Sequence, residues 1–129
     1  MTTPFGYRKA VSLSFSEAVA KVRDELTKEG FGVITEIDVK DTFKKKLDVD
    51  YGKYIILGAC NPPSALKALG TEKGIGLFLP CNVIVYSEGE QTRVAAIIPT
   101  VAMGMIENPE LHAIATDIGQ RLERVIAAI

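Results

Sequence analysis

Two short motifs hold the residues best suited to chemistry in this chain of 129 residues. One reads Cys60-Asn61-Pro62 and the other reads Cys81-Asn82, and together they contain both cysteines of the sequence. A thiol can act as a nucleophile or as a soft-metal ligand, and an asparagine amide can hydrogen-bond a polar ligand. We therefore take Cys60, Asn61, Pro62, Cys81 and Asn82 as the candidate ligand-binding residues.

Metal binding is one hypothesis for the two thiols, with Cys60 and Cys81 as the candidate ligands. Two thiolates are too few for zinc, which needs four protein ligands, or three and a water. The single histidine, His112, lies in a distant predicted helix, and no spacing brings it to either cysteine. A Cys–His catalytic dyad meets the same difficulty. We therefore predict no catalytic residues, favour a protein that is not an enzyme, and name no cofactor.

Each motif also has a structural interpretation. A free cysteine is commonly a small buried hydrophobic residue at a strand end. Asn61 is suited to cap a helix that begins at Pro62, and Asn82 to hydrogen-bond in a loop or at a strand start. Cys60 would then stand just before a helix N-terminus, where amide donors favour a thiolate and a lowered pKa. The functional and the structural interpretation both stay open at this point.

Composition describes an ordinary globular protein. Hydrophobic residues make up 47% and charged residues 24%, so we expect one compact domain over residues 1–129. The net charge of −1 argues against a nucleic-acid partner. No apolar stretch is long enough to cross a bilayer, and no charged leader precedes an apolar run at the start. We expect a cytoplasmic protein without a membrane partner, in which the thiols stay reduced.

The hydrophobic pattern predicts five strands and two main helices. We expect strands over residues 7–13, 31–38, 53–59, 83–86 and 92–98. A capping box at Ser14 and Glu17 opens the first helix and Gly30 ends it, while Asn108 caps the last helix. Short helices are predicted over 39–47 and 62–69, a flexible glycine-containing loop over 70–76, and irregular chain over 100–106. In the strand over 31–38, we expect Phe31 and the odd-numbered residues after it to share one face.

This order, β-α-β-β-β-β-α with short helical insertions, predicts an α+β fold. We expect a mainly antiparallel five-stranded sheet with helices on one face. If the strand that ends at Cys60 pairs antiparallel with the strand that starts at Cys81, the two cysteines meet at one end of the sheet. That end would be the site.

Three stretches, over residues 30–39, 54–63 and 79–85, are similar to a known family. The core of the second reads Leu-Gly-Ala-Cys-Asn-Pro-Pro, and the third begins Leu-Pro-Cys-Asn-Val. With these motifs the chain resembles the domain-of-unknown-function 302 family from about residue 7 to residue 129. The resemblance implies a fold like a half-domain of the TATA-binding protein, and a homodimer. It implies no activity, and the shared fold would not imply DNA binding.

Two functions fit these observations. The first is a binding module for a small-molecule ligand, or one that responds to thiols or metal, with its site at the two Cys-Asn motifs. The second is a structural or interaction protein that acts through a homodimer surface, in which the cysteines only pack the core.

Overall fold

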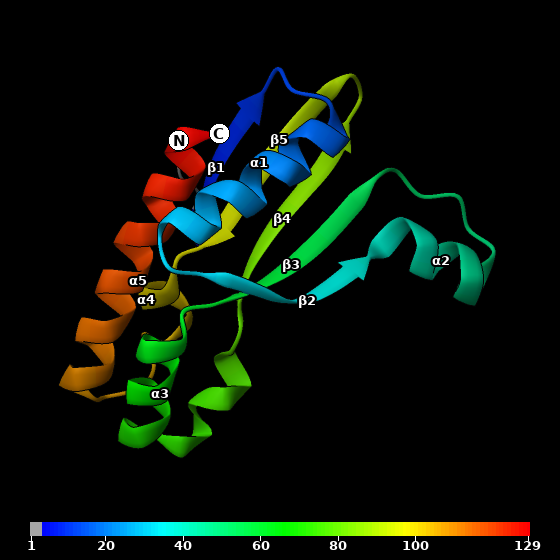
Figure 1. Ribbon diagram of the computed structural model, residues 1–129. Helices are drawn as coiled ribbons and strands as arrows, with labels where there is room; N and C mark the ends of the chain where they lie inside the picture. Colours follow the sequence, from blue (N-terminus) through cyan, green and yellow to red (C-terminus); the bar gives the residue numbers. More distant parts are fainter. Residues whose placement is uncertain (1–3) are drawn as a thin grey trace.

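One antiparallel sheet forms the frame of the protein. The computed structural model describes residues 4–129 and places the five strands in the order β1-β5-β4-β3-β2 (Figure 1). Every neighbouring pair is antiparallel, which confirms the predicted α+β fold. The strands are β1 (Gly6–Val11), β2 (Gly32–Asp38), β3 (Tyr54–Cys60), β4 (Cys81–Glu88) and β5 (Gln91–Ile97).

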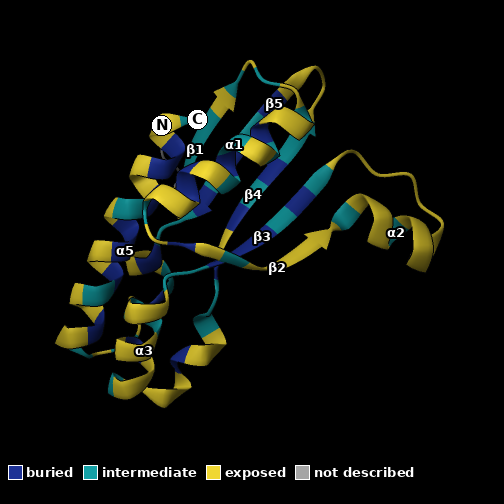
Figure 2. Cartoon of the chain, viewed as in Figure 1, coloured by how far each residue is buried: buried dark blue, intermediate teal, exposed yellow. Residues whose placement is uncertain are grey.

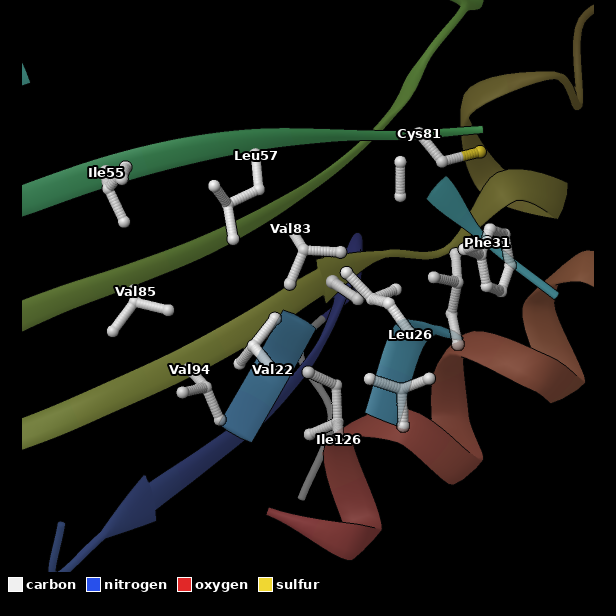
Figure 3. Packing of buried hydrophobic residues seen from close by; sticks show 14 of the residues in the cluster. Val22, Leu26, Phe31, Ile55, Leu57, Cys81, Val83, Val85, Val94 and Ile126 are labelled. Carbon is white, nitrogen blue, oxygen red and sulfur yellow. The ribbon is translucent and has the colours of Figure 1, made fainter. Parts of the chain in front are cut away.

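Two long helices, α1 (Phe15–Lys28) and α5 (Pro109–Ala128), cover one face of the sheet. Their buried stripes face the sheet, while their outer sides are exposed (Figure 2). Val22 and Leu26 of α1 and Ile126 of α5 lie over the inward side chains of β3 and β4, such as Leu57 and Val83 (Figure 3). Removing this apolar surface from water is the main stabilising term of the fold.

Local signals start and end these helices as the sequence predicts. Ser14 and Glu17 form the reciprocal capping box of α1, and Gly30 follows that helix with φ of +84°. Asn108 accepts hydrogen bonds from two backbone amides in the first turn of α5. Each arrangement satisfies backbone groups that a helix end leaves unpaired.

The end of α1 is also joined to α5. Arg121 donates from Nη1 to the backbone carbonyl of Glu29 at 3.1 Å, and Arg124 donates two hydrogen bonds to the Glu29 carboxylate, at 2.9 and 3.1 Å. The hydrogen bonds from Arg124 lower the pKa of Glu29. These contacts hold the two helices together where the chain turns into β2.

The smaller helices gather at the two ends of the sheet. Helix α2 (Val39–Leu47) follows β2 at one end, projects from the body and has no buried residue (Figure 1). At the other end lie α3 (Pro62–Thr71), the 3-10 helix η1 (Lys73–Phe78) and α4 (Pro99–Ala102). Here a second, smaller core cluster forms from Ala68, Ile75, Met103, Leu111 and Ala115.

Two of these elements differ from the sequence prediction. The chain predicted as a flexible loop over residues 70–76 is partly the helix η1, because Glu72 caps it and Ile75 is fully buried. The chain predicted as irregular begins with the single turn of α4, which Pro99 opens. Both are short turns that burial stabilises, so hydrophobic periodicity does not reveal them.

The predicted alternation along β2 is wrong after Val33. Val33 pairs with Ala59 and Thr35 pairs with Gly58, so Ile34 is an extra residue that forms a β-bulge. A bulge shifts every later side chain of the strand to the other face. Phe31 and Val33 therefore pack into the main core, whereas Thr35 lies on the opposite face of the sheet, beside Gly58.

Among residues 4–129, no helix is both long and apolar enough to cross a membrane.

Candidate functional site

The pairing of β3 with β4 brings the two Cys-Asn motifs to the same end of the sheet. The strands are antiparallel and Ala59 lies opposite Cys81, so Cys60 is the next residue beyond that pair. This is the topology on which the sequence hypothesis depended. Both cysteines line one cavity at this end.

The cavity has a volume of about 280 Å³ and is partly open to solvent. It lies where the main core meets the smaller cluster, and residues of both clusters line it. Its walls come from the ends of the strands and from two helices, with Ser64, Ala65, Ala68 and Leu69 of α3 facing Leu111, Ile114, Ala115 and Ile118 of α5. Alanines supply part of both walls, and these small side chains leave the space that larger residues would fill.

The two thiols differ in their surroundings. Cys81 is 7% exposed and lies at the end of the core beside Phe31 (Figure 3). Burial, with a smaller contribution from negative charge on Cys60, raises the pKa of Cys81 to about 11. Cys60 is half-buried and is the less buried of the two residues. Cys81 is therefore a neutral thiol at physiological pH.

Asn61 lines the cavity, but its amide is already engaged. Oδ1 accepts from the backbone N–H of Ser64 at 3.2 Å, so Asn61 caps α3. Nδ2 donates to the carbonyl of Gly30 at 3.2 Å, which ties α3 to the chain that enters β2. Pro62 is the exposed first residue of α3 and is not part of the cavity wall. Asn61 and Pro62 thus position the site by starting its helix.

Asn82 lies on the other face of the sheet. It is exposed and lines a second pocket of about 270 Å³, together with Arg8, Ile84, Tyr86 and other residues of that face. Although Asn82 directly follows Cys81 in β4, it is not among the residues that line the cavity with Cys60, Asn61 and Cys81. The structure therefore separates Asn82 from Cys60, Asn61 and Cys81.

Other groups that could hold a metal lie elsewhere. His112 is exposed, with Nε2 2.6 Å from the carbonyl oxygen of Ile106, and it does not line the cavity. Within residues 4–129 there is no group of three or more histidine, cysteine, aspartate or glutamate side chains arranged to hold an ion. Cys60 and Cys81, with the thioether of Met103 in the same wall, are the sulfur groups that the cavity offers.

Sequence reasoning missed several cavity residues. Ile34 reaches the wall through the bulge, and the α5 residues are apolar residues of a helix that also packs on the sheet. Pro80, next to Cys81, also lines the cavity and follows a cis peptide bond from Leu79. Pro80 could have been found from its place next to Cys81, whereas Ile34 and the α5 residues offer only their apolar type, which does not distinguish a cavity wall from a core.

Comparison with known proteins places this fold and these motifs in a family. The family model described as "Domain of unknown function DUF302" matches residues 7–129. A crystal structure of an uncharacterized conserved DUF302 protein from Bacillus stearothermophilus is 34% identical, with a TM-score of 0.90. The match covers 96% of this chain and 97% of that one. No curated protein matches this chain. The chain therefore belongs to the DUF302 family.

Proposed function

We propose that this protein is a small-molecule-binding module whose site is the cavity between the end of the sheet, α3 and α5. The observation that carries this proposal is the cavity itself, a space of about 280 Å³ with both cysteines in its wall. A concave, mostly apolar pocket with a few polar groups is the usual form of a small-molecule site. Cys60, Asn61 and Cys81 belong to it, while Asn82 does not.

The cavity also has features that suit binding better than packing. It lies between the two core clusters, so a ligand in the cavity would not push apart the packed side chains of either cluster. Its wall includes Cys60, a half-buried thiol that can react with or contact a ligand. A binding module that responds to thiol chemistry would use Cys60 for this purpose, since Cys81 stays protonated.

Binding can be tested by NMR titration of the ¹⁵N-labelled protein with fragments from three charge classes, namely neutral, anionic and cationic. We expect at least one fragment to shift the amides of cavity residues and to slow labelling of Cys60 by iodoacetamide. Ala65→Leu places a larger side chain in the wall and should abolish both effects. Ala113→Leu, at an exposed position of α5, is the matched control. The proposal fails if fragments of all three classes leave the cavity amides unshifted.

A second function is favoured by the face of the sheet opposite α1 and α5. No helix among the described residues covers this face, and it carries Ile56 and Ile84 and the stacked rings of Tyr54 and Tyr86, with ring centroids 5.3 Å apart. Contiguous uncovered apolar surface often marks a protein interface. We propose that a second copy of the chain packs here to form a homodimer.

Sedimentation velocity tests the dimer. We expect wild-type protein to sediment as a dimer and Ile84→Lys to sediment as a monomer, because a buried unpaired lysine is costly. Leu77→Lys changes an equally apolar but 90% exposed residue on η1 and should leave the dimer intact. A wild-type protein that is monomeric at high micromolar concentration would contradict this proposal.

A further inference from the structure

The chemistry of the cavity wall limits what it can hold. None of the described residues that line it is charged. The amide of Asn61 is used at both ends within the protein, and the buried thiol of Cys81 is neutral. On α5, Asp117 and Arg121 pair with each other at 3.0 Å rather than facing the cavity. An ionic ligand would therefore lose its hydration without gaining a counter-charge.

The volume of the cavity sets the size of the ligand. An apolar cavity of roughly 150 Å³ is known to bind benzene. This cavity, at about 280 Å³, offers nearly twice that space and is partly open. A bicyclic aromatic or a similarly compact hydrocarbon group matches this volume.

Ile34 is placed to cover such a ligand. It is the unpaired residue of the β2 bulge, it is 62% exposed, and it nevertheless lines the cavity. Leu69 of α3 is a second exposed apolar residue in the wall. A bulge often changes the direction of a side chain at a functional site. When a ligand covers an exposed isoleucine, more apolar surface is removed from water than at a residue that is already buried.

We propose that the cavity takes an uncharged, apolar ligand of about the size of a bicyclic aromatic, and that Ile34 contacts this ligand at the cavity mouth. The inference rests on the proposed function, because it names the ligand class of the same site. Ile34 is then a positioning residue for the ligand rather than part of the folded core.

Two fluorescent probes that differ mainly in one charged group test the ligand class. Naphthalene is neutral, and naphthalene-1-sulfonate carries the same two rings with a sulfonate. We expect the neutral probe to bind at least about tenfold more tightly, since nothing in the wall compensates the sulfonate. Ala65→Leu should remove the binding of the neutral probe, and Ala113→Leu should not.

The contribution of Ile34 is measured in the same assay. Ile34→Ala should weaken binding of the neutral probe roughly five- to tenfold, because several methyl and methylene contacts are lost. Its thermal midpoint should stay close to that of wild type. Leu77→Ala, which removes an exposed leucine outside the cavity, should leave the affinity unchanged.

The outcomes separate this inference from the function on which it rests. Equal affinity for the two probes, or binding of the neutral probe that survives Ala65→Leu, would overturn the apolar ligand class. An unchanged affinity in Ile34→Ala would overturn the role of Ile34. If charged fragments shift the cavity amides while the neutral probe does not bind, the binding function stands and the ligand class fails. If no fragment of any class shifts them, the function itself fails.

Discussion

Gly58, in the interior strand β3, is where one added methyl group should disturb the site most. A Cβ atom at this position would lie 2.0 Å from Oγ1 of Thr35 and 2.6 Å from Cγ of Pro80. Both distances are far below van der Waals contact. Pro80 directly precedes Cys81 and lines the cavity, so a displaced ring would also shift the cavity wall. We therefore expect Gly58→Ala to lower both stability and ligand affinity.

The size of the effect follows from what can move. The Thr35 hydroxyl can rotate away, but the closed ring of Pro80 cannot, so the backbone next to Cys81 must shift. Overpacking of this kind commonly costs about 1–3 kcal/mol, and we expect about 2 kcal/mol for Gly58→Ala. For a chain of this size that cost corresponds to a fall in Tm of roughly 6–10 °C.

Denaturant unfolding and thermal melts of three variants check this reasoning. Gly32→Ala, in the neighbouring strand, meets no atom within 4 Å and should change the free energy of unfolding by less than about 0.5 kcal/mol. Thr35→Ala combined with Gly58→Ala removes the hydroxyl contact and should recover about 0.5–1 kcal/mol relative to Gly58→Ala alone. If Gly58→Ala has the same melting temperature as Gly32→Ala and wild type, the steric argument is wrong.

Further predictions concern Cys81, Asn61 and Glu29. In the Cys60→Ser variant, labelling of Cys81 by iodoacetamide at pH 8 should be about one hundredth as fast as for a thiol of pKa 9.0, rising as pH approaches 11. Because this pKa is raised on folding, Cys81 also contributes stability that is complete below pH 9 and lost towards pH 11, a dependence that Cys81→Ala should remove in urea titrations. Asn61→Ser keeps a cap acceptor but loses the donor to Gly30, so its free energy of unfolding should fall by about 1 kcal/mol, and that of Asn61→Ala by about 2 kcal/mol. Glu29→Gln should cost about 0.5–1 kcal/mol at pH 7 by guanidinium unfolding. Since the pKa of Glu29 is lowered in the folded protein, this difference from wild type should shrink as pH falls through that pKa, and a constant difference down to pH 2 would contradict the role given to the ion pair.

The strand prediction succeeded where local patterns were strong. The sequence pattern showed the buried strand that ends at Cys60 and the hairpin of β4 and β5. Antiparallel pairing of β3 with β4 then brings the two cysteines together. The sequence prediction grouped Asn82 with Cys81, whereas in the structure Asn82 lines the pocket on the other face of the sheet. The likeness to a half-domain of the TATA-binding protein and the cytoplasmic location stay predictions.

By itself, the sequence determined the five strands, the two long helices and their order, because caps, turns and hydrophobic periodicity are local properties. Ser14 with Glu17, Asn61 with Pro62, and Asn108 each start a helix through contacts within a few residues. Only the tertiary structure decided that the cysteine motifs border a cavity. That space depends on how α3 and α5 meet the sheet end, and on a bulge that turns Ile34 towards it. Such features arise from packing between segments distant in sequence, where small side chains such as Ala65 and Ala115 leave volume that no local pattern records.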